Sequence, residues 1–149
     1  MPTEMTPRHI EILLVEDNPA DVLITQEALR EARLINTIHV VEDGVAALAF
    51  LHRQGPYATA PRPDLVLLDL NLPKKNGHEV LAEIKADPDL KLIPVVVLTT
   101  SRAKEDITKV YGLAANCYMV KPVDFASSVV AMQSISHFWL NVVTLPSEV

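Results

Sequence analysis

The chain has 149 residues, of which 49% are hydrophobic and 21% are charged, and its formal net charge at pH 7 is −6. This length fits one domain with a full hydrophobic core, and the acidic balance argues against nucleic acid as a direct partner, because phosphate binding needs a basic surface. No apolar run is long enough to span a bilayer, and residues 1–5 lack the basic-then-apolar pattern of a signal peptide, so we expect no membrane contact. The single cysteine, Cys117, excludes an internal disulfide and favours a reducing, cytoplasmic location.

Short apolar runs alternate with segments of helical periodicity. The apolar runs predict five strands, at residues 10–15, 37–41, 65–68, 94–98 and 117–120. Helices are predicted after each strand, at residues 19–32, 44–51, 77–86, 103–113 and from after Pro122 to about residue 143. Asn18 followed by Pro19 is typical of a helix N-cap. Residues 55–63 contain three prolines and are expected to form a long surface connection without regular structure.

The strict alternation of strands and helices predicts a doubly wound α/β fold, with a flavodoxin-like five-stranded parallel sheet and five helices. We expect residues 1–149 to form a single domain, with its core over about residues 10–143 and no second domain that could act as an output. In open parallel sheets the ligand site lies at the carboxyl edge, where all the strands end. Functional side chains are therefore expected at that edge.

Charged side chains follow three of the predicted strands. Glu16 and Asp17 come directly after the first strand, Asp69 after the third and Lys121 after the fifth. Because these strand ends share one edge, the three carboxylates should lie together, where they repel one another unless a divalent metal and a lysine provide positive charge. Taken singly, each residue would be an ordinary surface residue. Together they predict a metal-dependent site in which Asp69 is a nucleophile for a phosphoryl group.

These residues closely resemble the receiver domain of two-component response regulators, and the resemblance covers residues 10 to about 143. It implies that Asp69 accepts the phosphoryl group, and that Lys121 and Thr99, at the end of the fourth strand, contact the phosphoryl oxygens. It also implies a site for Mg²⁺, for which Mn²⁺ or Ca²⁺ is expected to substitute. The implied metal ligands are Asp17, Asp69, the backbone carbonyl of Asn71 and, through water, Glu16.

The resemblance implies a single-domain response regulator that accepts a phosphoryl group from a sensor histidine kinase and signals by protein–protein contact. Such a protein is not an enzyme, beyond catalysing its own phosphorylation and slow dephosphorylation. Slow dephosphorylation is expected because Thr100 is bulkier than the small residue that many receivers carry there, and because Ser101 has no long charged side chain to direct water.

The sequence leaves other functions open. One is a phosphorelay intermediate that passes phosphate to a histidine phosphotransfer protein, and another is a phosphorylation-independent interaction module. An interaction module that works without phosphorylation would not need Thr99 and Lys121 beside three acids. A phosphatase of the haloacid dehalogenase type needs a second acid two residues after its nucleophile, and Asn71 cannot protonate a leaving group. A flavodoxin-type cofactor binder is disfavoured because residues 16–19 are acidic where a phosphate-binding loop is needed.

Two further features concern the output of the protein. Tyr118 lies three residues before Lys121, and the resemblance implies that its ring is a switch that turns inward when phosphate draws in Thr99. The last predicted helix carries an apolar arc of roughly 200°, wider than one core contact needs. We therefore predict a homodimer through the fourth helix, the fifth strand and the last helix. The residues expected on the dimer face are Ile135, Phe138, Trp139 and Val142.

A narrower resemblance involves the last part of the chain. The segment Phe138-Trp139-Leu140 and the proline-bearing connection at residues 55–63 are similar to those of stand-alone regulators associated with bacterial and cyanobacterial phytochromes. This resemblance implies that the partner is a phytochrome-type histidine kinase, which senses light.

Overall fold

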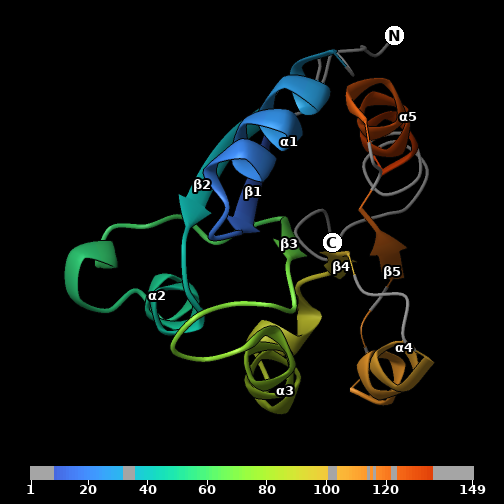
Figure 1. Cartoon of the computed structure of the whole chain (residues 1–149). Helices are drawn as coiled ribbons and strands as arrows, with labels where there is room; N and C mark the ends of the chain where they lie inside the picture. Colours follow the sequence, from blue (N-terminus) through green and yellow to red (C-terminus); the bar gives the residue numbers. More distant parts are fainter. Residues whose placement is uncertain are drawn as a thin grey trace, which may run out of the picture.

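The structure, a computed structural model, describes residues 9–31, 36–100, 104–113, 115, 117–121 and 124–135. These residues form a five-stranded parallel sheet in the order β2-β1-β3-β4-β5 (Figure 1). The strands are β1 (Ile10–Val15), β2 (Asn36–Val41), β3 (Leu65–Leu68), β4 (Val95–Thr99) and β5 (Cys117–Val120). The doubly wound parallel fold predicted from the sequence is confirmed, and every strand begins and ends within one residue of its predicted bounds.

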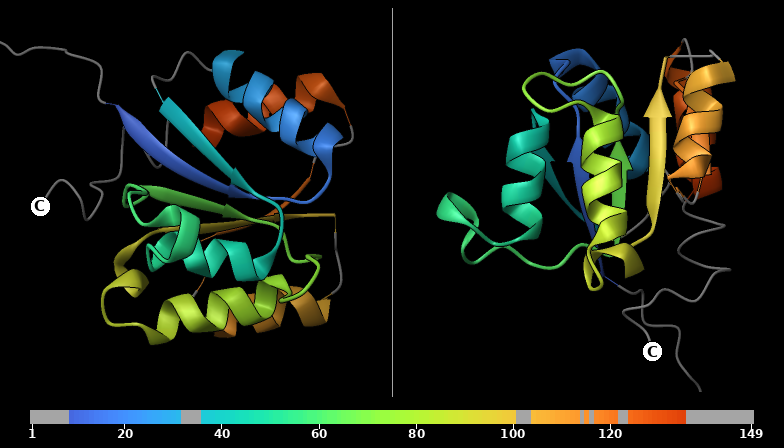
Figure 2. Two further views of the ribbon diagram at one scale, coloured as in Figure 1. Left: turned by 90° about the vertical axis from the view of Figure 1, so that its left-hand side faces the viewer. Right: turned by 90° about the horizontal axis from the view of Figure 1, so that it is seen from below.

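Helices cover both faces of the sheet. They are α1 (Pro19–Glu31), α2 (Gly44–Leu51), α3 (Gly77–Ala86), α4 (Lys104–Gly112) and α5 (Phe125–Ile135). Figure 2 shows α1 and α5 together on one face and α2, α3 and α4 on the other. The predicted continuation of the last helix to about residue 143 lies outside the described residues. In the part of the chain that the structure describes, no helix is both long enough and apolar enough to cross a bilayer.

The apolar strands are explained by two cores, one on each face. In β1, Ile12 and Leu14 pack against α1 and α5, whereas Leu13 and Val15 pack against α2 and α3. This follows from the alternation of side chains along a strand. All residues of the central strand β3 are 0% exposed. An uninterrupted apolar run is therefore required there, as in other parallel sheets that are covered on both sides.

The connection at residues 55–63 differs from its prediction. Gly55–Tyr57 forms one turn of 3-10 helix, η1, so the expectation of no regular structure is wrong there. Pro56 lies in the first turn, where an N–H group would have no partner within the helix, and its fixed φ favours a helical turn. A second such turn, η2 (Leu90–Leu92), precedes β4 and was not predicted.

The turn that follows helix α2 contains an arginine in a conformation that favours glycine. Arg53 has a φ of 55°. Its N–H donates to the carbonyl of Phe50 (3.1 Å), and the N–H of Gln54 donates to the carbonyl of Ala49 (2.9 Å), which is the Schellman pattern of a helix end.

We expect Arg53→Gly to raise the free energy of unfolding by about 0.5–1 kcal/mol in urea titrations, because the left-handed conformation penalises a Cβ atom. Arg53→Ala is the matched control, since it removes the side chain but keeps Cβ. Equal stabilisation by both variants would contradict the explanation from backbone strain.

Candidate functional site

The strand ends bring the predicted charged residues to one edge of the sheet. Glu16 directly follows β1, Asp69 follows β3 and Lys121 follows β5. The backbone ladders continue into these residues, because the N–H of Asp69 donates to the carbonyl of Val15 (3.1 Å) and that of Lys121 to the carbonyl of Thr99 (2.7 Å). The sheet itself therefore fixes where these side chains begin.

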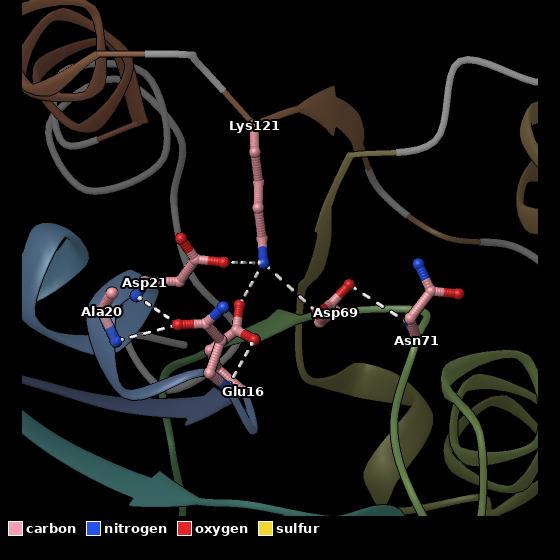
Figure 3. Close-up of polar contacts among 7 residues, drawn as sticks. Glu16, Ala20, Asp21, Asp69, Asn71 and Lys121 are labelled. Carbon is pink, nitrogen blue, oxygen red and sulfur yellow. Dashed lines mark hydrogen bonds and ion pairs between the residues drawn. The ribbon is translucent and has the colours of Figure 1, made fainter.

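Lys121 joins the acidic side chains at this edge (Figure 3). Its Nζ donates to Oε1 of Glu16, to Oδ2 of Asp21 at 2.9 Å and to Oδ2 of Asp69 at 3.2 Å. The side chain of Glu16 is 3% exposed and that of Asp69 is 8% exposed. One ammonium group thus faces three carboxylates, of which two have little access to water, and it can balance only part of their charge.

The burial of these groups changes their acidity. Burial raises the pKa of Glu16 to about 7; the hydrogen bond from Lys121 opposes this shift and the negative charge of Asp69 adds to it. Burial alone would lower the pKa of Lys121, but the hydrogen bonds to Glu16 and Asp21 and the charge of Asp69 raise it overall. Lys121 is therefore charged at neutral pH, and the site as a whole favours additional positive charge.

Asp21 is a residue of this site that the sequence reasoning missed. It lies in the first turn of α1, and its side chain is 33% exposed. The Oδ1 atom of Asn18 accepts hydrogen bonds from the N–H groups of Ala20 (2.9 Å) and Asp21 (3.3 Å), so Asn18 caps the helix as predicted (Figure 3). An acid in the first turn is common because it favours the helix dipole, and nothing in the sequence marks its contact with Lys121.

The loop that follows Asp69 also contacts its side chain. The N–H of Asn71 donates to Oδ1 of Asp69 at 3.3 Å. This contact involves the N–H of Asn71, whereas the resemblance to receiver domains implies a metal-binding role for its carbonyl. At the start of α3, the N–H of Gly77 donates to the carbonyl of Leu70 (2.9 Å). The loop thus returns to the strand end and packs against the backbone of Asp69.

Three of the predicted metal ligands lie together. Carboxylate oxygens of Glu16, Asp17 and Asp69 are all within 4.8 Å of one another. Oxygen atoms of this kind are the ligands that Mg²⁺, Mn²⁺ and Ca²⁺ prefer. Because the lysine balances only part of the negative charge, the donor set fits a divalent cation. The sequence prediction that these acids converge is confirmed.

The two predicted switch residues lie on one face of the sheet. Thr99 is 0% exposed at the end of β4, and its side chain points to the same face as that of Val97, which packs with α2, α3 and α4. Tyr118 is half-buried against the same core, and it pairs in register with Val97. Its backbone N–H donates to the hydroxyl oxygen of Tyr111 on α4 at 3.2 Å.

The predicted dimer face needs one correction. Ile135 is only 3% exposed and packs with Met132 and Leu98 in the core between the sheet, α1 and α5, so it is not on an exposed face. The periodicity did not separate the core side of the helix from its outer side, because apolar residues occur on both. The other predicted face residues, Phe138, Trp139 and Val142, lie outside the described residues.

The strand order 2-1-3-4-5 is that of the flavodoxin-like doubly wound folds, in which the site lies at the carboxyl edge. Here that edge carries a cluster of acids and a lysine, the side chains expected of a receiver domain. The chain belongs to the response regulator receiver domain family, whose model matches residues 12–133.

Comparison with known proteins shows which response regulators this chain resembles. The chain is 50% identical to the response regulator Rcp1 of Synechocystis sp. over 147 residues, which cover 99% of each chain. Among solved structures it resembles the phosphorylated cyanobacterial phytochrome response regulator RcpA, with 51% identity, a TM-score of 0.89, and coverage of 93% of this chain and 99% of that one. It also resembles the Mn²⁺-bound form of Rcp1, with 52% identity, a TM-score of 0.86, and coverage of 92% and 99%. The chain is thus a two-component receiver related to phytochrome response regulators.

Proposed function

We propose that this receiver domain accepts a phosphoryl group on Asp69 from a sensor histidine kinase and signals by contact with other proteins. The observation that carries the proposal is the position of one buried carboxylate, Asp69, whose oxygen lies 3.2 Å from the ammonium of Lys121 and close to the carboxylates of Glu16 and Asp17. Positive charge at this place would stabilise the charge that develops on a transferring phosphoryl group.

The proposed reaction is an in-line displacement at phosphorus. A carboxylate oxygen of Asp69 forms the new bond to phosphorus while the phosphorus–nitrogen bond of a phosphohistidine breaks, and its electron pair stays on the imidazole. Lys121 supplies a compact positive charge to one phosphoryl oxygen, and the hydroxyl of Thr99 donates to another. The protein acts as a phosphoryl acceptor and signal carrier, and its catalysis is confined to its own phosphorylation and dephosphorylation.

The donor set supports Mg²⁺ as the cofactor. Asp17, Asp69, the carbonyl of Asn71 and, through water, Glu16 would hold it, with further water as the remaining ligands. When bound, the cation neutralises charge on the carboxylates and on the phosphoryl oxygens. Mn²⁺ or Ca²⁺ is expected to substitute, and the relative Rcp1 has been solved in a Mn²⁺-bound form.

A direct test uses acetyl phosphate as a small phosphodonor. The native chain is incubated with acetyl phosphate, with Mg²⁺ or with a chelator, and its intact mass is measured. We expect the mass of one phosphoryl group to be gained only with the metal. A chain that gains no adduct with Mg²⁺, or gains it equally in the presence of the chelator, would refute metal-dependent acceptance.

The partner is proposed to be a phytochrome-type histidine kinase. The support is the similarity to RcpA and Rcp1, since the RcpA structure is described as that of a phytochrome response regulator. We propose further that residues 1–149 work as a single receiver domain, with a core of about residues 10–143. The alignment with Rcp1, which covers 99% of each chain, supports this organisation.

The output is proposed to depend on the α4-β5-α5 side of the molecule. Phosphorylation would draw Thr99 toward the phosphoryl group, and the ring of Tyr118 would turn into the vacated space. Exposed apolar residues on α4 and α5 support a contact surface on this side; they include Tyr111 (51%), Phe125 (46%) and Val130 (61%). A second copy of the chain is the proposed occupant, in a symmetric homodimer.

We expect light scattering at high micromolar concentration to show a dimer for the native chain and a larger monomer fraction for Val130→Asp, because a carboxylate would be desolvated in the interface. The matched control is Leu23→Asp, which changes an equally exposed residue of α1 (62%). A native chain that is monomeric with and without phosphorylation would count decisively against the dimer.

Slow dephosphorylation stays a prediction. It depends on Thr100, which is exposed beside the site, and on Ser101, which lies outside the described residues. Exchanging Thr100 for alanine should shorten the lifetime of the phospho form, because a smaller side chain admits water more easily. The lifetime is read from the decay of the intact-mass adduct after removal of the phosphodonor, and a native lifetime of only seconds would contradict the prediction.

A further inference from the structure

We propose that Asp21 is a positioning residue that keeps the ammonium group of Lys121 within the phosphoryl-accepting site. This inference rests on the proposed function, because it assigns a role to Asp21 in the same reaction. Asp21 would not touch the phosphoryl group and would act only through Lys121.

The side chains of Asp21 and Lys121 are in direct contact, and the backbone around Asp21 is held in place by hydrogen bonds. Oδ2 of Asp21 lies 2.9 Å from Nζ of Lys121, closer than Oδ2 of Asp69 at 3.2 Å. The cap of α1 by Asn18 fixes the first helical turn, and the N–H of Asn18 in turn donates to Oε2 of Glu16 at 3.2 Å. These hydrogen bonds and the contacts of Lys121 with Glu16 and Asp21, which Figure 3 shows, link the end of β1, the first turn of α1 and Lys121.

The side chain of Lys121 is 12% exposed, and it borders a small open space beside the site. Lys121 and Asp21 both line a small cavity between α1, β4 and α5, whose other walls include Leu98 and Met132. A lysine stem has four carbons with free rotation, and ordering it costs conformational entropy. The contacts of the ammonium group with Glu16, Asp21 and Asp69 offset that cost.

Asp21 differs from Glu16 and Asp69, the other partners of Lys121, because it would not be a ligand of a bound metal. Glu16 and Asp69 belong to the cluster of carboxylates that fits a divalent cation, whereas Asp21 does not. A divalent cation at that cluster would share the charge of those two carboxylates and would repel the ammonium of Lys121. Asp21 would then be the partner that holds Lys121 near the oxygen atoms of Asp69.

The kinetic test compares Asp21→Asn with the native chain at saturating Mn²⁺. We expect phosphoryl uptake from acetyl phosphate to be about tenfold slower, the effect of losing one charge-assisted hydrogen bond, and the calorimetric Kd for Mn²⁺ to change less than about threefold. Asp21→Glu, which keeps the charge, should recover part of the rate. Glu27→Gln is the control, because Glu27 lies on the same helix and pairs with Arg30.

A second test needs neither metal nor phosphodonor. Urea unfolding of native chain, Asp21→Asn, Lys121→Met and the double variant forms a thermodynamic cycle. Without Lys121, Asp21 repels the nearby acids but still interacts favourably with the dipole of α1, so replacing it should change stability little. With Lys121 present, Asp21→Asn also removes the ion pair between the two side chains. We therefore expect the effect of Asp21→Asn on the folding equilibrium constant to differ between the two backgrounds by about fivefold.

The outcomes separate this inference from the proposed function. A native chain that gains no phosphoryl group would overturn the proposed function. A native chain that is phosphorylated, with Asp21→Asn reacting at the same rate, would overturn only the role of Asp21. That role is also overturned if a slow rate comes with a matching loss of Mn²⁺ affinity, since Asp21 would then act only as a nearby charge. Additive effects in the urea cycle would overturn it too.

Discussion

Replacing Asp69 with asparagine is expected to abolish the phosphoryl adduct, with the rate of uptake from acetyl phosphate falling at least about 1,000-fold. The amide that replaces the carboxylate has no negative charge and is a poor nucleophile. The other carboxylates cannot substitute, because Glu16 contacts Lys121 from the end of a different strand and Asp17 is exposed. The intact mass after incubation with phosphodonor and Mg²⁺ gives the measurement.

The loss in Asp69→Asn should not come from unfolding. The negative charge of Asp69 helps to raise the pKa of Glu16, so its removal should lower that pKa and relieve repulsion between two buried acids. Lys121 keeps its contacts with Glu16 and Asp21. We therefore expect a free energy of unfolding equal to or higher than that of the native chain.

The control for this experiment is Asp89→Asn, which removes the same charge from a side chain that is 75% exposed and pairs with Arg62. Its phosphoryl uptake should match the native rate. If Asp69→Asn acquires the adduct as readily as this control, then Asp69 is not the acceptor.

Most of the fold could be predicted from the sequence because each strand is an apolar run bounded by turn residues. The central strand β3 is buried on both sides, so its four residues had to be apolar, and its bounds were predicted correctly. The short turn η1 could not be predicted, because prolines indicate a break in regular structure more clearly than a single 3-10 turn. The sequence also could not tell which apolar residues of α5 face the core and which face outward. Ile135, for example, was predicted on the dimer face but lies in the core.

The site was predictable only where residues follow strands. Glu16, Asp69 and Lys121 are placed by the ends of parallel strands, so topology alone brings them together. Asp21 is placed by the direction of α1 relative to the end of β5, which depends on the packing between α1 and α5 and leaves no local pattern in the sequence. Contacts of this second kind, made between a helix and a distant strand end, require the tertiary structure.

The second large effect is expected at Gly77, at the start of α3. A Cβ atom there would lie 2.3 Å from the carbonyl oxygen of Asp69 and 2.5 Å from the Cα of Leu70. Both are backbone atoms, so no side-chain rotation can relieve the contact. Either the start of α3 or the backbone of Asp69 and Leu70 must move, although Asn76 and Glu79 fix this helix end with reciprocal hydrogen bonds.

We expect Gly77→Ala to lower the free energy of unfolding by about 3 kcal/mol and to slow phosphoryl uptake at least about tenfold, because the carboxylate of Asp69 would leave its position beside Lys121. Urea titration and the intact-mass assay measure the two effects separately.

The matched control is Gly112→Ala at the end of α4, where an added Cβ would meet nothing within 4 Å. It should change the free energy of unfolding by less than about 1 kcal/mol and leave uptake unchanged. The comparison isolates the close approach of α3 to Asp69, since both variants add the same methyl group to a helix terminus. If the two variants prove equally stable and equally reactive, the packing of Gly77 against the acceptor strand does not position Asp69.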